Sequence, residues 1–182
     1  MAKIQNNVVM HGASGKLANQ IVFRKGKGGQ LIVSAKPSTG RTFNPTQLAQ
    51  QEAFRNAIAY AKSAKDEDIY ITKAQGTTLS AFNAAVADWF GKPEVLEIDT
   101  TNWTGAVGEI IRVKAQDDTQ VTKVHVQITN GIAMVEQGDA VAADGLWWEY
   151  TTTTVANVTT AKVKATAHDL PGNNHMLLWQ NS

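Results

Sequence analysis

From residue 93 onward, hydrophobic and polar residues alternate in short runs. In residues 123–128, for example, Val124, Val126 and Ile128 are separated by lysine, histidine and glutamine. Successive side chains of a β-strand point to opposite faces, so each such run predicts a strand with one buried face. Asn130-Gly131 is the strongest hairpin signal in the chain and joins two of these strands. The predicted strands are 95–98, 109–115, 121–129, 132–136, 146–152, 161–167 and 174–179.

The pattern between residues 45 and 65 has the spacing of a helix instead. Its apolar stripe consists of Phe54, Ala57, Ile58 and Ala61. Asn44 and Gln47 fit a capping box around Pro45, which predicts the helix start. Two further helices are predicted, one over 66–74 and one from Ser80 to Gly91. Because these apolar faces are rich in alanine, they bury little area and need another surface to pack on.

Before the helices, short β-prone runs alternate with glycines. Residues 21–23 and 31–33 are strongly apolar, and the Lys-Gly-Lys-Gly-Gly sequence between them predicts a β-hairpin with a flexible basic tip. An isolated hairpin is marginally stable in water, so this ribbon also needs a surface on which to lie.

These patterns predict an α+β protein with two parts. Residues 1–92 form a basic β-hairpin plus helical segment, and residues 93–182 form an antiparallel β-sandwich. Seven short strands in about 90 residues are typical of the immunoglobulin-like sandwich.

Three segments of the C-terminal part also carry a resemblance. They are 111–118 (IRVKAQDD), 121–126 (VTKVHV) and 163–173 (VKATAHDLPGN). Together they resemble bacterial immunoglobulin-like domains, over roughly residues 94–180. The resemblance implies the sandwich fold and roles such as spacer, adhesive module or particle decoration, but no activity. The N-terminal half is similar to uncharacterised bacterial proteins of the same architecture, and that similarity implies no activity either. Such domains usually follow a secretion signal, whereas here the domain follows a basic helical segment.

The charge of the chain is divided unevenly along its length. The net charge is +1, but residues 1–41 hold seven basic and no acidic residues. The rest of the chain holds ten basic and sixteen acidic residues, a net charge of −6. A basic head and an acidic body favour binding to polyanions or to other copies of the same chain.

The composition also bears on compartment. The chain has no cysteine, so it forms no disulfide or zinc–thiolate site, and it must be stabilised by packing alone. The first residues are too polar for a cleavable signal peptide, and no segment reaches membrane-spanning length. We therefore expect a protein that is cytoplasmic at synthesis, either as a cytoplasmic product or as one released with a phage or other assembled particle.

Candidate chemical motifs are weak. Gly12-Ala-Ser-Gly15-Lys16 lacks the first glycine and the final Ser or Thr of a phosphate-binding loop, so a glycine turn between strands is the favoured interpretation. No nucleophile elbow or zinc-protease motif is present. Metal binding was considered for two sets: His168, Asp169 and His175; and Asp117, Asp118, Asp169 and Asn173. Turn formation explains these residues better, so we predict no catalytic residue, cofactor or metal.

Two features instead suggest contacts with partners. Strand alternation places Trp148 and Tyr150 on the core face, which leaves Trp147 on the outer face. There Trp147 either contacts a partner protein, contacts a sugar, or packs under the helical half of the same chain. The second feature is the basic ribbon, with Arg24, Lys25, Lys27 and Lys36. It has few aromatic residues for stacking on bases, so a nucleic acid is less favoured than a second copy of the chain, and a solvated loop tip stays an alternative.

The sequence therefore predicts a non-catalytic structural subunit that self-associates into a filament, tube or phage-like particle through its basic ribbon. Its partner is another copy of itself or another structural protein. The alternatives are a monomeric protein- or carbohydrate-binding module and a nucleic-acid-associated protein that uses residues 1–41.

Overall fold

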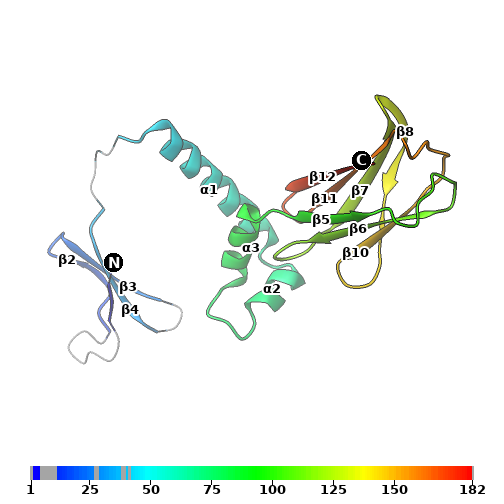
Figure 1. The fold of residues 1–182 in the computed structure, drawn as a ribbon. Coiled ribbons are helices and arrows are strands. Elements are labelled where there is room, and N and C mark those ends of the chain that lie inside the picture. Colours follow the sequence, from blue (N-terminus) through cyan, green and yellow to red (C-terminus); the bar gives the residue numbers. More distant parts are fainter. Residues whose placement is uncertain (1, 5–11, 27–28, 38–39, 41, 182) are drawn as a thin grey trace. The chain divides into compact units, whose positions relative to one another are not determined.

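The computed structural model describes residues 2–4, 12–26, 29–37, 40 and 42–181. The chain is an α+β protein with three antiparallel sheets and divides into two compact units, Met1–Ala84 and Ala85–Ser182. Figure 1 shows the order of the elements along the chain. Across the described residues, no helix combines the length and apolar character needed to cross a membrane.

The first unit begins with a four-stranded antiparallel sheet in the order β1-β4-β3-β2. The strands are β1 (Ala2–Ile4), β2 (Gly15–Leu17), β3 (Ile21–Lys25) and β4 (Leu31–Ala35). The predicted hairpin is confirmed, because β3 pairs with β4 from Ile21↔Ala35 to Lys25↔Leu31. Two further strands, β1 and β2, flank this hairpin and complete the sheet.

A tight turn joins β2 to β3. Ala18 and Asn19 have φ values of 48° and 58°, and Gln20 N donates to Leu17 O at 3.0 Å. Three residues, 18–20, connect the paired Leu17 and Ile21, and the first two of them are left-handed, as in the turns whose twist matches an antiparallel pair. Asparagine tolerates this conformation well and alanine does so poorly, so the turn stores strain at Ala18.

Helix α1 (Pro45–Ala64) starts as predicted. Asn44 Oδ1 accepts from Gln47 N at 2.8 Å, and Gln47 Oε1 accepts from Asn44 N at 3.1 Å, which completes the capping box. The predicted apolar stripe is only partly buried: Ala57 and Ala61 are buried, whereas Phe54 is 51% exposed. The expectation that Phe54 packs inward is therefore wrong.

Helices α2 (Asp68–Ala74) and α3 (Ala81–Phe90) follow. Tyr60 of α1 and Tyr70 of α2 contact edge-to-face, and their hydroxyl oxygens are 2.6 Å apart. The boundary between the two units falls inside α3, whereas the sequence placed the domain boundary after residue 92.

The second unit contains two four-stranded sheets around one hydrophobic core (Figure 1). One has the order β5-β6-β10-β9 and the other β12-β11-β7-β8. The strands are β5 (Glu94–Asp99), β6 (Ile110–Gln116), β7 (Lys123–Asn130), β8 (Ala133–Asp139), β9 (Val141–Ala142), β10 (Trp147–Thr151), β11 (Ala161–His168) and β12 (Asn174–Gln180). Every strand predicted in this half is present, with bounds shifted by up to a few residues, and β9 is additional.

The core is built from the alternating positions. Val124, Val126 and Ile128 of β7 are fully buried, as is Val163 of the neighbouring β11. The opposite sheet contributes residues such as Ile111 to the same cluster. Each of these aliphatic side chains contributes about 1.5–3 kcal/mol by leaving water, so this unit has a substantial core of its own.

Candidate interaction surfaces

One face of the N-terminal sheet is mainly apolar, with Lys25 at its end, and the other carries Lys16 and Arg24. The register aligns Leu17 with Ile21 and Phe23 with Val33, so these four side chains share a face. Of the described residues in this sheet, Phe23 and Leu31 are the buried hydrophobic ones, while Leu17 is 55% and Ile21 37% exposed. The apolar face of this sheet is therefore only partly buried.

The opposite face carries positive charge. Lys16 lies opposite Val22, and Arg24 is two residues further along the same strand, so Lys16 and Arg24 share this face. Both are exposed. In the sequence Lys16 stands out only as part of the glycine motif, yet it belongs to β2 and contributes to the basic surface.

Of the four predicted ribbon cations, the three that the structure describes do not form one cluster. Arg24 and Lys25 are successive residues of β3 and point to opposite faces. Lys36 Nζ donates to Asn19 Oδ1 at 2.8 Å, beside the β2–β3 turn. Lys27 lies outside the described residues.

Trp147 is on the outer face of β10, as the alternation predicted. Its neighbours Trp148 and Tyr150 pack on the core side. The Trp147 ring is half-buried, because the Arg112 guanidinium lies 4.7 Å and Lys114 Nζ 5.6 Å from the ring centroid. Arg112 Nε is also 3.4 Å from a carboxylate oxygen of Glu149. The surface around Trp147 is thus a stack of ring and cations rather than a bare aromatic platform.

Strand β5 concentrates negative charge at the edge of the same sheet. Three of its six residues are acidic, and Glu94 and Glu97 are exposed while Asp99 is half-buried. Hydrogen bonds from the side chain and backbone of Thr101 hold the pKa of Asp99 below its usual value. The lowered pKa keeps the Asp99 carboxylate ionised near neutral pH.

The sandwich also carries the excess acidic charge of the chain. Residues 85–182 hold twelve acidic and six basic residues, a net charge of −6, whereas residues 42–84 hold four of each. The imbalance seen in the sequence is therefore between the N-terminal sheet and the sandwich, and the helices are neutral.

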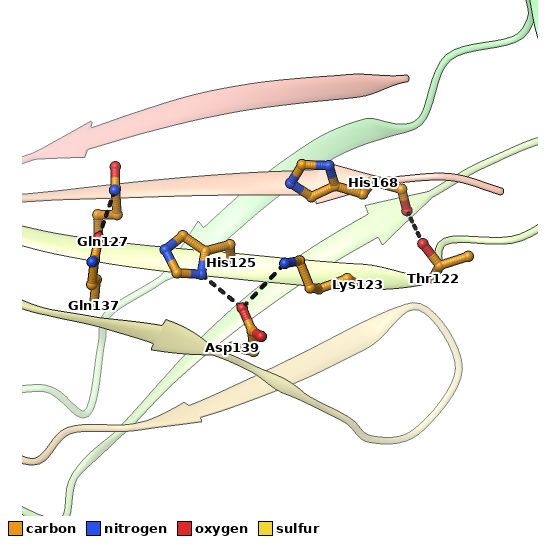
Figure 2. A network of polar contacts seen from close by, with 7 residues as sticks. All are labelled: Thr122, Lys123, His125, Gln127, Gln137, Asp139 and His168. Atoms are coloured by element: carbon orange, nitrogen blue, oxygen red, sulfur yellow. Dashed lines mark hydrogen bonds and ion pairs between the residues drawn. The ribbon is translucent and has the colours of Figure 1, made fainter. Parts of the chain in front are cut away.

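The outer face of the other sheet bears a polar network, shown in Figure 2. His125 Nδ1 lies 2.7 Å and Lys123 Nζ 3.8 Å from Asp139 Oδ1, and Gln127 Nε2 donates to Gln137 Oε1 at 2.9 Å. The hydrogen bond with His125 is the main reason that the pKa of Asp139 is below its usual value, and the positive charge of Lys123 adds to it. These contacts tie β7 to the edge strand β8 across the open face.

The residues first considered as metal ligands serve local structure. His175 Nδ1 accepts from Val95 N at 3.0 Å, which links β12 to β5. Asp169 accepts from Gly172 N at 2.8 Å and from Asn173 N at 2.6 Å, and so closes the turn before β12. Asn173 Nδ2 then donates to Gly91 O at 2.9 Å, which anchors the end of α3.

A different acidic group does come together. Among the described residues, Asp88, Asp117 and Asp118 each place an oxygen within 4.8 Å of the others. Asp88 is buried in α3, and Asp117 Oδ2 accepts from the backbone of Thr119 and Gln120. Carboxylate oxygens are ligands that calcium prefers, but Asp117 already serves the turn after β6.

Comparisons with known proteins add little. No family model matches the chain, and no curated protein matches it. Among solved structures, the crystal structure of an engineered protein at 1.98 Å resolution is 18% identical, with a TM-score of 0.36. That match covers 55% of this chain and 25% of the other.

Proposed function

We propose that this chain is a non-catalytic structural subunit that self-associates into a larger assembly, such as a filament, tube or phage-like particle, through its N-terminal sheet. The observation that carries the proposal is the partly covered apolar face of that sheet. A β-sheet must bury its apolar face against another layer to be stable. Among the residues of this sheet whose side chains are described, only Phe23 and Leu31 are buried, and Leu17 and Ile21 remain exposed.

The exposed apolar area has a definite energetic value. Full burial of a leucine or isoleucine side chain contributes about 2 kcal/mol. Since Leu17 is 55% and Ile21 37% exposed, covering both contributes about 2 kcal/mol per contact. This gain is small for one contact, but it repeats at every subunit of a polymer, where each copy is held by two neighbours.

The distribution of charge favours a second copy as the partner. A segment of charge +7 and a sandwich of charge −6 attract each other between copies. A head-to-body contact of this kind is heterologous, so it propagates into rings or open filaments rather than closing as a symmetric dimer.

We further infer that the sandwich is an immunoglobulin-like domain. Its sheet orders, β5-β6-β10-β9 and β12-β11-β7-β8, support this, because they correspond to strands A-B-E-D and G-F-C with an added C′ strand. Domains of this type present rigid outer faces and suit the role of a decorating or spacing element in an assembly.

The experiment is size-exclusion chromatography with light scattering over a concentration series, with negative-stain images of the same fractions. We expect polymers or a defined large oligomer for the natural chain and a marked loss of assembly in the double variant Leu17→Ser/Ile21→Ser. The matched control is Leu48→Ser, which removes a similarly exposed leucine from α1. A monomer near 19.6 kDa at every concentration would refute self-association.

A second candidate is a binding module that uses the outer face of β6 and β10. The observation in its favour is the half-buried Trp147 flanked by Arg112 and Glu149, since tryptophan and arginine are common at the centres of protein interfaces. A natural chain that stays monomeric would favour this candidate.

A further inference from the structure

Open strand edges decide where an added strand can bind. An edge strand presents unpaired backbone N–H and C=O groups, and proteins protect such edges with charge, bulges or short strands. In the N-terminal sheet β2 is an edge, and in the sandwich β5, β9, β8 and β12 are edges. These edges differ in how well they would accept a basic strand.

Strand β2 is a basic and apolar edge. It consists of Gly15, Lys16 and Leu17, all exposed, and it pairs on its inner side with Ile21–Phe23 of β3. Lysine on an edge discourages pairing with a second copy of the same strand, because the two ammonium groups would lie close together.

Strand β5 is the acidic counterpart. Its pairing with β6 shifts register between Val95 and Glu97, and Val95 N is bonded to His175. Beyond Val95, residues 96–99 of this edge strand contain Glu97, Asp99 and the 39%-exposed Leu96. Its length suits the three residues of β2.

We propose that β2 of one copy adds to the edge of β5 in a second copy, with Lys16 beside the carboxylates of Glu97 and Asp99. This inference rests on the proposed self-association and names the two surfaces that meet. Opposite charges on directly opposed positions stabilise an antiparallel pair, and Leu17 gains contact with Leu96. Like charges disfavour both the β2–β2 and the β5–β5 pairs, so the contact joins unlike surfaces and extends without closing.

The remaining edges of the sandwich suit β2 less well. Strand β9 has two residues, and β8 turns Glu136 inward while its Asp139 already contacts His125 and Lys123. The partner strand of β12, β11, carries Lys162 and Lys164, which would repel Lys16. Charge complementarity therefore selects β5.

Reciprocal charge reversal in the full-length chain tests the pairing. In the variant Lys16→Glu, both β2 and the edge of β5 are acidic. In the variant Glu97→Lys, β2 stays basic and β5 has lost a carboxylate that complements Lys16. We expect each variant alone to need at least about tenfold more protein for half-maximal assembly, as measured by light scattering. An equimolar mixture of the two should recover assembly as an alternating copolymer, to within about twofold of the natural chain.

Two matched controls carry the same charge changes elsewhere. Lys62→Glu is on α1, outside the N-terminal sheet, and Asp144→Lys is in the loop before β10. Both controls should assemble like the natural chain. Recovery in the mixture also shows that both variants are folded.

The outcomes separate this pairing from the broader proposal. If Leu17→Ser/Ile21→Ser abolishes assembly but the two charge variants assemble normally or fail to rescue each other, the pairing is wrong and self-association stands. If the natural chain never assembles, both are wrong.

Discussion

The turn before β12 allows a quantitative prediction about the stability of the sandwich. Asp169 is 5% exposed and accepts three hydrogen bonds, from Gly172 N, Asn173 N and Asn173 Nδ2, at 2.8, 2.6 and 2.8 Å. The same Asn173 amide donates to Gly91 O, so the carboxylate supports the connection between α3 and β5 as well as its own turn. We therefore examine the substitution Asp169→Ala.

A hydrogen bond to a charged group contributes about 1.5–3 kcal/mol. Gly172 is exposed, so water can replace part of what is lost, and the low end of that range applies. Three bonds at about 1.5 kcal/mol each predict that Asp169→Ala lowers the free energy of unfolding by about 4.5 kcal/mol. For a chain of this size, in which 1 kcal/mol shifts Tm by about 2–4 °C, the loss corresponds to a drop of roughly 9–18 °C.

Tryptophan fluorescence during urea unfolding measures this loss selectively. The five tryptophans of the chain all belong to the second unit: Trp89, Trp103, Trp147, Trp148 and Trp179. The control Asp144→Ala removes an exposed carboxylate and should change stability by no more than about 0.5 kcal/mol. A loss below about 1 kcal/mol for Asp169→Ala, or an equal loss in the control, would refute the reasoning.

Three other predictions concern single groups. Asn44→Ala removes the cap of α1 and should cost about 1 kcal/mol of helix stability, seen as lower helical signal in circular dichroism on warming, with Asn44→Asp retaining most of it. Burial, and then the charge of Glu136, raise the pKa of Tyr150 to about 12. The neutral, buried hydroxyl of Tyr150 therefore contributes stability that is present below about pH 10 and is lost as the pH rises through 12. An absorbance titration should show one late-ionising tyrosine that is missing in Tyr150→Phe, and a normal titration would contradict the burial argument. The lowered pKa of Asp139 means that its pairing with His125 stabilises the fold above about pH 4 and ceases to do so as pH falls through the folded value. The difference in urea midpoint between the natural chain and Asp139→Asn should therefore shrink between about pH 5 and pH 2, and a difference that grows on acidification would oppose this assignment.

Local sequence determined the elements themselves. The alternation of Val124, Val126 and Ile128 predicts a strand with one buried face because side-chain direction in a strand has a period of two. The start of α1 is determined as locally, since Asn44 and Gln47 satisfy backbone groups within one turn. The same alternation placed Trp147 on the outside of its strand. The division into a basic head and an acidic body was also visible in the sequence, because it requires only a count of charged residues.

Tertiary structure decided what each element packs against. Phe54 lies at a helical spacing that predicts burial, yet it is exposed, because spacing identifies a shared face and not its partner. The meeting of Asp88 with Asp117 and Asp118 joins α3 to the β6–β7 loop, and no local pattern encodes that distance. Likewise, Lys16 became part of a basic face, and β5 an acidic edge, only once strand order and register were known. Strand order depends on which pairings together cover the core, and that is a property of the whole chain rather than of any one segment.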